Sequence, residues 1–194
     1  MRRARSLALT FDDGPDPVWT PRLLDLLARL DARATFFVVA PRAVAHPDLV
    51  ARIIAEGHSI GLHCGEHVRH AAREIGWCRE DTSRALVQLK HAAGVVPKLW
   101  RTPWGDRAPW TRRVADEYGL RLTGWSVDTH DWRGDNAFQM FRAVADELEP
   151  GAVVLAHDGV GPGARRADAR ETLGFVELTA ARAAREDLRL EGLR

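Results

Sequence analysis

The sequence predicts an α/β fold in which helices cover a parallel sheet. Short, continuous apolar runs alternate with amphipathic stretches along the 194 residues, as they do where helices join buried parallel strands. About seven such units follow one another, which is more than a small open sheet usually needs and slightly short of a full eight-fold barrel. No linker or repeat interrupts them, so residues 1–194 are expected to form a single domain.

The elements follow from the spacing of the apolar residues. Apolar runs indicate strands at residues 7–11, 34–39, 58–63, 98–101, 120–127 and 152–157. Helical spacing indicates helices at residues 21–30, 47–57, 79–93, 108–119, 136–148 and 167–186. Thr20 is the expected N-cap of the first helix, with Pro21 at its first position. Gly57 and Gly94 are expected to end the second and third helices.

Composition and charge narrow the classes of protein. Lys and Arg total 28 and Asp and Glu total 27, so the net charge of +1 indicates no nucleic-acid surface. The two cysteines, Cys64 and Cys78, are too few for a disulfide framework and too far apart for a CxxC metal site. We expect reduced thiols, with a single disulfide left open, and no protein partner is evident from the sequence.

The N-terminus carries no recognisable targeting signal. Only the apolar residues LAL separate the basic stretch MRRAR from the polar TFDDG, which is too short for a signal peptide. No apolar run approaches the roughly 18 residues of a membrane span. We therefore expect a cytoplasmic protein without membrane insertion, although a secreted chain whose leader had been removed would look the same.

Polar residues that could perform chemistry follow the predicted strands at their carboxyl ends. These residues are Asp12, Asp13, His63, Arg101, Asp128 and His157. Active sites of parallel α/β folds are built at this end of the sheet. The repeated placement therefore indicates one site to which several strands contribute.

The stretch HCGEH places His63 and His67 four residues apart, which on a helical turn would put both imidazoles on one face. Two histidines and one carboxylate form a hydrolytic zinc site with a position open for water, and Asp13 offers the carboxylate. A bound divalent cation would lower the pKa of water toward about 7, so that an ionised Asp12 could accept its proton. The alternatives are a pair of exposed loop histidines and a turn with an Asx hydrogen bond at DDGP.

Two charge pairs are predicted around this cluster. Arg101 could pair with Asp12, keeping the carboxylate ionised and oriented; the alternative is a purely structural ion pair. Asp128 could favour the imidazolium form of His157, which would then donate a proton to a leaving group. The alternative for His157 is a core histidine bonded to the backbone.

Seven tryptophans accompany a single tyrosine. Trp100, Trp104, Trp125 and Trp132 lie on or near the predicted strand ends. They could pack in the core, or they could form an apolar wall for a small acyl group or a stacking face for a sugar ring.

Five motifs in this order resemble those of the polysaccharide deacetylase family, also called the NodB homology domain or carbohydrate esterase family 4. They are TFDDGP (10–15), HCGEH (63–67), RTPWG (101–105), DTHDW (128–132) and LAH (155–157). The resemblance extends from about Leu7 to Leu193 and implies a distorted (β/α) barrel of about seven parallel strands with outer helices. Two positions depart from the family pattern: Cys64 replaces a Ser or Thr, and Trp104 stands where Tyr is common.

The resemblance also implies roles for individual residues. The implied metal ligands are Asp13, His63 and His67, and the implied catalytic residues are Asp12 as base, His157 as acid, Arg101 orienting the base and Asp128 keeping the acid protonated. The implied substrate-binding residues are Pro103, Trp104 with its backbone N–H on the oxyanion, Trp132 and Leu155.

The function implied by the resemblance is metal-dependent hydrolysis. The enzyme would remove N-acetyl groups from an amino sugar or an N-acetylated polysaccharide and release acetate, with Zn²⁺ as the expected ion and Co²⁺ or another divalent metal as alternatives. A deformylase, amidohydrolase or O-acetyl esterase acting on a small intracellular sugar metabolite remains an alternative. A non-catalytic carbohydrate-binding domain and a DxD-type phosphatase are the candidates from other classes.

Overall fold

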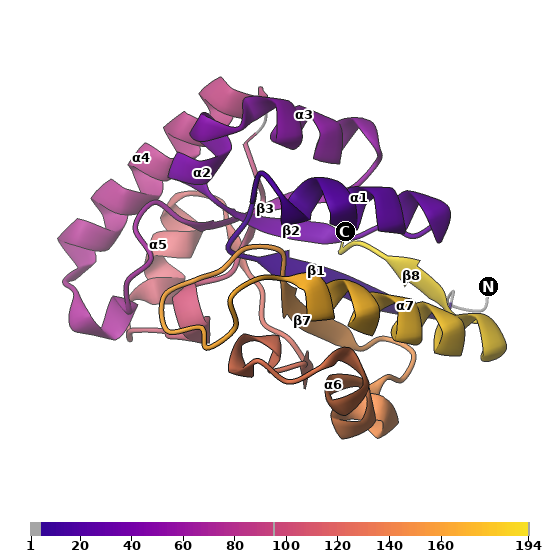
Figure 1. The fold of residues 1–194 in the computed structure, drawn as a ribbon. Helices are drawn as coiled ribbons and strands as arrows, with labels where there is room; N and C mark the ends of the chain where they lie inside the picture. The colour runs from indigo at the N-terminus through magenta and orange to yellow at the C-terminus, as the bar shows by residue number, and fades with distance from the viewer. Residues whose placement is uncertain (1–4, 95, 194) are drawn as a thin grey trace.

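The computed structural model describes residues 5–94 and 96–193, which form a curled parallel sheet with helices outside it (Figure 1). The strands are β1 (Ser6–Asp12), β2 (Thr35–Val39), β3 (Ser59–Cys64), β4 (Leu99–Trp100), β5 (Arg121–Leu122), β6 (Val127–Asp128), β7 (Val153–His157) and β8 (Arg189–Glu191). Their order is β5-β4-β3-β2-β1-β7-β6, and β8 pairs with the beginning of β1. All the pairings are parallel. The α/β prediction and the distorted barrel of about seven parallel strands are thus confirmed.

The helices connect these strands along the outside of the sheet. They are α1 (Trp19–Arg29), α2 (Ala40–Ala45), α3 (Pro47–Ala55), α4 (Ile75–Ala93), α5 (Thr111–Glu117), α6 (Ala137–Val144) and α7 (Arg170–Arg185). Short 3₁₀ turns are η1 (His70–Ala72), η2 (Pro103–Gly105), η3 (Asp131–Arg133) and η4 (Ala145–Glu147). Figure 1 shows α1 and α7 on the side of the sheet near β8, and α4 and α5 at the opposite side.

The centre of the sheet is buried on both faces, which explains why its strands are continuous apolar runs. Every residue of β2 is buried, and so are the last four residues of β1. Leu23, Leu24 and Leu27 of α1 are fully buried in the same core. Removal of this apolar surface from water is the main force that holds the helices on the sheet, at about 25 cal/mol per Å².

The predicted strand at 120–127 is interrupted because this segment crosses the opening of the barrel. The Thr123 N–H donates to the Trp100 carbonyl on β4 (2.8 Å), whereas the Ser126 N–H donates to the Val153 carbonyl on β7 (2.9 Å). The segment therefore leaves one end of the sheet and joins the other. Among the described residues, β5 and β6 are not paired with each other, so the barrel stays open between them.

Other differences lie at the ends of elements and in short elements. Thr20 is not the N-cap of α1, which begins at Trp19; instead the Asp16 carboxylate accepts hydrogen bonds from the backbone of Val18 and Trp19, both at 2.8 Å. Gly94 ends α4 in the left-handed conformation, as predicted. The short elements α2 and β8 were not predicted, because six and three residues are too few to display a clear period.

Gly61 of β3 allows a side chain of the neighbouring strand β2 to pack closely against the β3 backbone. Gly61 pairs with Phe37 of β2, and a Cβ at Gly61 would come within 2.5 Å of the Phe37 ring. Arg101 also contacts this ring, with its guanidinium 4.2 Å from the ring centroid. The lack of a side chain at Gly61 therefore leaves room for the Phe37 ring, which packs against Arg101 of the predicted site.

We predict that Gly61→Ala lowers the free energy of unfolding by about 1–3 kcal/mol, because the added methyl overpacks the sheet. Urea unfolding followed by circular dichroism measures the change. Gly76→Ala is the matched control, since a Cβ at Gly76 in α4 meets nothing within 4 Å and the change should be neutral or slightly stabilising. Equal unfolding midpoints for wild type and Gly61→Ala would contradict the packing argument.

Candidate active site

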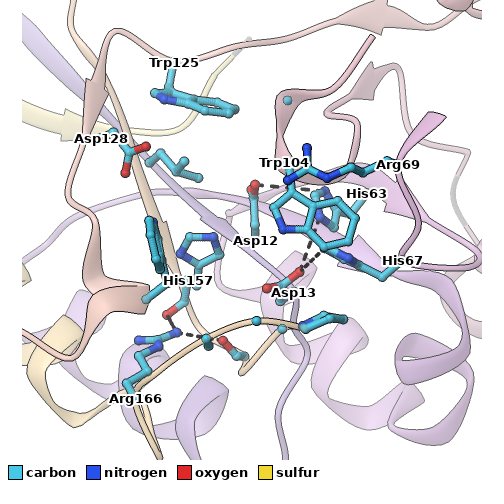
Figure 2. Close-up of a pocket in the computed structure, with 18 residues that line it drawn as sticks. Asp12, Asp13, His63, His67, Arg69, Trp104, Trp125, Asp128, His157 and Arg166 are labelled. Atoms are coloured by element: carbon cyan, nitrogen blue, oxygen red, sulfur yellow. Dashed lines mark hydrogen bonds and ion pairs between the residues drawn. The ribbon is translucent and has the colours of Figure 1, made fainter. Parts of the chain in front are cut away.

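The carboxyl ends of the strands surround a pocket of about 480 Å³ (Figure 2). Asp12 at the end of β1 is in register with His157 at the end of β7, so these two side chains start from adjacent strands. β3 brings His63 to the same rim, and Arg101 follows β4 directly. The structure therefore brings these polar strand ends to one edge of the sheet, while their role as a single site stays a prediction.

Asp13, His63 and His67 converge on one point of the pocket. The Asp13 Oδ1 lies 3.3 Å from His63 Nε2 and 3.1 Å from His67 Nε2, and one ligand atom of each residue lies within 4.8 Å of the others. His63 is the fifth residue of β3 and His67 lies in the loop after it, so the helical turn expected for HCGEH is wrong. The bend of this loop, not a helix face, brings the two imidazoles together.

The hydrogen bonds around the cluster leave its ligand atoms free. His63 Nδ1 lies 2.8 Å from the Arg101 carbonyl, which requires the proton on Nδ1 and leaves the lone pair of Nε2 facing Asp13. The buried Asp13 Oδ1 has no hydrogen-bond donor. Burial raises the pKa of Asp13, but the adjacent His63 and His67 outweigh it and hold the pKa far below its usual value. An ionised oxygen between two imidazole nitrogens fits a bound cation.

The turn after β1 is held by contacts to its backbone. Asp13 has a positive φ of 72°, and its carbonyl accepts from Arg42 Nη1 at 2.7 Å. Gly161, in the glycine-rich loop after β7, lies against the Asp13 carboxylate, where a Cβ would overlap it. The Asp13 side chain thus faces the histidines and not its own turn, in contrast to the Asx-turn alternative.

Asp12 is oriented by the predicted arginine. Arg101 Nη1 donates to Asp12 Oδ1 at 2.9 Å and to Thr10 Oγ1 at 2.8 Å. Arg101 Nη2 donates to the Gly124 carbonyl at 2.8 Å. The side chain of Arg101 is completely buried, so the pairing with Asp12 is shielded from solvent and fixes the direction of the carboxylate.

The predicted pairing of Asp128 with His157 is wrong, because the partner of His157 is Asp131. His157 Nδ1 lies 2.6 Å from Asp131 Oδ1, and the His157 N–H donates to Asp131 Oδ2 at 3.0 Å. Asp128 is in register with Leu155, two residues before His157, and it accepts from the His130 N–H at 2.8 Å. His130 has a positive φ of 52°, and the resulting turn carries Asp131 to the end of β7. Asp128 nevertheless lines the pocket.

Arg166 completes this pair and was not found from the sequence. It donates through Nη1 to Asp131 Oδ2 (3.1 Å) and to Thr172 Oγ1, and through Nη2 to the carbonyls of His157 and Gly159. No local pattern distinguishes Arg166 from the other arginines of the chain. Asp131, by contrast, could have been found from the sequence, because it is the second Asp of the motif DTHDW.

The charges around His157 favour its protonated form. Burial lowers the pKa of His157, but the charge and hydrogen bond of Asp131, with smaller contributions from Asp12 and Asp13, raise it to about 9. Burial would raise the pKa of Asp131 in turn, yet His157 and Arg166 hold it below its usual value. The imidazolium is therefore the form present at neutral pH. Its Nδ1 is hydrogen-bonded to Asp131, and its other ring nitrogen is available to donate a proton.

Aromatic side chains form part of the pocket wall, as one of the two interpretations of the tryptophans predicted. Trp104, Trp125, Trp132 and Leu155 line the pocket, and Trp104 is 41% exposed. Trp100 is instead buried in the core, where its Nε1 donates to the His63 carbonyl. Pro103, predicted to bind substrate, is buried in η2 and does not line the pocket.

The two cysteines are free and buried. Burial raises the pKa of both thiols, that of Cys78 to about 11, so neither is an activated nucleophile.

In the described part of the chain no helix combines the length and apolar character needed to cross a bilayer.

Comparison with known proteins places this geometry in a family. Residues 2–123 match the family model described as polysaccharide deacetylase. The chain is 36% identical over 166 residues to a chitooligosaccharide deacetylase of Bradyrhizobium sp. (strain ANU 289), covering 84% of this chain and 74% of the relative. It is 37% identical over 155 residues to a peptidoglycan-N-acetylglucosamine deacetylase of Bacillus cereus, covering 80% of this chain and 56% of the relative.

Solved structures agree with the sequence relatives. The Bc1960 peptidoglycan N-acetylglucosamine deacetylase superimposes with a TM-score of 0.89 at 31% identity, covering 98% of this chain and 86% of that one. A family 4 carbohydrate esterase from Streptomyces lividans, solved with acetate, gives a TM-score of 0.85 at 30% identity, covering 95% and 90%.

The comparisons overturn the expected cytoplasmic location. The relatives from Bacillus cereus and Listeria monocytogenes are named as peptidoglycan deacetylases, and peptidoglycan is a polymer of the cell wall, outside the cytoplasm. The short apolar stretch LAL, on which the expectation rested, carries no weight against this finding.

The match therefore rests on three independent comparisons: a family model over more than half of the chain, relatives above 30% identity, and structures that superimpose over nearly the whole fold. The named relatives are deacetylases, which are hydrolases of N-acetyl groups. This chain belongs to the polysaccharide deacetylase family.

Proposed function

We propose that this enzyme removes the N-acetyl group from N-acetylglucosamine units of an oligosaccharide or polysaccharide, producing acetate and a free amine. The observation that carries the proposal is the convergence of Asp13, His63 and His67 beside Asp12 and opposite His157 in one pocket. The names of the relatives, chitooligosaccharide and peptidoglycan-N-acetylglucosamine deacetylases, support the substrate class.

Asp13, His63 and His67 would hold the metal ion. Two imidazole nitrogens and one carboxylate oxygen suit Zn²⁺ with a position left open, and Co²⁺ accepts the same donors. The ion would supply Lewis acidity that polarises the acetamide carbonyl and acidifies the attacking water. The Arg101 carbonyl, through its hydrogen bond with His63 Nδ1, would keep that imidazole in the ligating tautomer.

Asp12 would act as the general base. Arg101 holds its Oδ1, and the other oxygen, Oδ2, remains available to accept a proton from the attacking water. The adjacency of Asp12 and Asp13 places the base next to the metal ligand, so the two consecutive carboxylates would divide the tasks of deprotonation and coordination.

His157 would act as the general acid on the leaving nitrogen. Asp131 holds its Nδ1, and the resulting imidazolium can release a proton from its other ring nitrogen into the pocket. As the C–N bond breaks, this proton would convert the leaving group to a neutral amine. Asp131 and Arg166 are positioning residues in this proposal, because they act through His157.

The remaining wall of the pocket would orient the acetyl group. Trp132 and Leu155 line the same pocket as His157 and would contact the acetyl methyl. The family resemblance assigns the backbone N–H of Trp104 to the carbonyl oxygen as negative charge develops on it. One such donor is worth about 3 kcal/mol of barrier.

Acetate release from a panel of substrates tests the proposed function. We expect the enzyme reconstituted with Zn²⁺ or Co²⁺ to release acetate from N-acetylglucosamine oligomers and from peptidoglycan, and removal of the metal with a chelator to abolish it. Formylated and O-acetylated sugars of the same length serve as the comparison. A preference for formate or for ester cleavage would contradict N-deacetylation as the main activity.

Substitutions at the two adjacent aspartates separate their roles. We expect Asp12→Asn to retain one equivalent of metal but to lose about 10²–10⁴-fold in kcat, because general base catalysis is removed. Asp13→Ala is expected to lose metal as well as activity. Metal content by mass spectrometry and acetate release measure both. Full activity and stoichiometric metal in Asp13→Ala would show that the roles are assigned wrongly.

The pH profile distinguishes Asp131 from Asp128 as the partner of His157. The acid must be protonated, so kcat should fall as the pH rises through the raised pKa of about 9. Asp131→Asn removes the negative charge, lowers the pKa of His157, and should move this basic limb to lower pH by about one pH unit or more. Asp128→Asn should leave the position of the limb unchanged.

Thermal unfolding of both variants shows whether Asp131→Asn remains folded over the pH range that is measured. A folded Asp131→Asn enzyme with a basic limb at the wild-type pH would remove Asp131 from this role.

A further inference from the structure

Arg69 is an exposed cation at the edge of the active-site pocket. It lies two residues after His67, lines the pocket, and places its guanidinium 4.7 Å from the ring centroid of Trp104. Trp104 in turn contacts His67, with 4.3 Å between the ring centroids. Figure 2 shows Arg69 beside Trp104, on the side of the pocket opposite His157. Trp104 thus contacts both Arg69 and His67, one of the proposed metal ligands.

The other charged groups that line this pocket have partners. Asp12 pairs with Arg101, Asp13 with two histidines, and Asp128 with His130. His157 and Arg166 share Asp131 on the opposite wall. For Arg69, by contrast, no carboxylate within 4.0 Å is found among residues 5–94 and 96–193.

Two acidic residues that belong to or contact this loop, Glu66 and Asp106, are already engaged. Glu66 pairs with Arg84 at 3.0 Å, and Asp106 accepts a hydrogen bond from the Ala71 N–H at 2.9 Å. The positive charge of Arg69 is therefore not neutralised within the described structure. A cation at the mouth of a pocket attracts anionic substrates and raises their rate of association.

The segment that carries Arg69 is anchored by the two residues that follow it. Asp106 holds the Ala71 N–H, and the neighbouring His70 is buried against the rings of Trp100 and Trp110. The Arg69 guanidinium lies over the Trp104 ring, and no carboxylate among residues 5–94 and 96–193 engages its N–H donors. These donors match the two oxygens of a carboxylate, and their prior orientation reduces the entropy lost on binding.

We propose that Arg69 binds a carboxylate carried by the sugar next to the acetamide that is hydrolysed, or by a short branch on that sugar. This inference rests on the proposed deacetylase function and narrows its substrate to acidic glycans in preference to neutral N-acetylglucosamine oligomers. Arg69 is a specificity residue in this proposal. The metal site and the acid–base pair act on the acetamide, whereas Arg69 binds the negatively charged group on the neighbouring sugar.

The test compares substrates that differ only in this charge. One is an N-acetylglucosamine tetramer in which a sugar next to the cleaved unit carries a free lactyl carboxylate, and the other is its methyl ester. We expect wild-type kcat/KM to be about five- to tenfold higher for the acid than for the ester, at low ionic strength. In Arg69→Gln this ratio should fall to about one, and Arg69→Lys should retain only part of it, because lysine keeps the charge but lacks the planar fork.

Arg73→Gln is the matched control. Arg73 is also an exposed arginine stacked on a tryptophan, 5.1 Å from the Trp77 ring centroid, but it does not line the pocket. We expect it to keep the wild-type ratio. Addition of salt should reduce the ratio in wild type and in Arg73→Gln, while leaving it near one in Arg69→Gln.

The outcomes separate this inference from the proposed function. A wild-type ratio near one, or a ratio unchanged in Arg69→Gln, with acetate released from both substrates, overturns the role of Arg69 and leaves the deacetylase intact. No acetate from any substrate overturns the proposed function itself. If the tetramer bearing a 6-phosphate is preferred through Arg69 and the carboxylate is not, the carboxylate assignment is overturned in favour of phosphate.

Discussion

The site depends on the buried ion pair between Arg101 and Asp12. Two adjacent carboxylates that are almost completely buried repel each other and lose their hydration, so each needs its own positive partner. Arg101 supplies the positive partner for Asp12, whereas Asp13 has the two imidazoles beside it and would gain its positive partner from a cation held by the three residues. The first pair is fixed by protein alone, whereas the second leaves a carboxylate oxygen without a hydrogen-bond donor. This asymmetry explains why one aspartate suits a base and the other a cation ligand.

Arg101 also connects parts of the fold that the hydrogen bonds of the sheet do not connect. Its Nη1 bonds β1 through Thr10 and Asp12, and its Nη2 bonds Gly124, within the segment that crosses the open side of the barrel. That segment leads into β6 and the turn bearing Asp131, which positions His157. The proposed base and the proposed acid are thus connected through Arg101 and this segment, even though Arg101 and Arg166 bind different aspartates.

Local patterns of the sequence predicted the parts of this site that lie at strand ends. Continuous apolar runs located β1, β3 and β7, and parallel pairing then required their terminal residues to meet at one edge. The choice between Asp128 and Asp131 lay beyond such reasoning. Asp128 ends the short strand β6 and Asp131 follows three residues later, and the turn at His130, with its positive φ, carries Asp131 to β7. Arg166 was out of reach for a similar reason: its contacts come from a loop whose path no periodicity encodes.

The proposed chemistry and the proposed selectivity would therefore reside in different parts of the chain. Asp12, His63 and His157 stand on the paired strands β1, β3 and β7, where a rigid sheet fixes their spacing, as a reaction that needs sub-ångström alignment requires. Arg69 lies in a loop that can change without disturbing those strands. A fold of this kind can keep one reaction and alter the glycan that it accepts, because the charge at the pocket mouth is set independently of Asp12, of the cluster of Asp13, His63 and His67, and of His157.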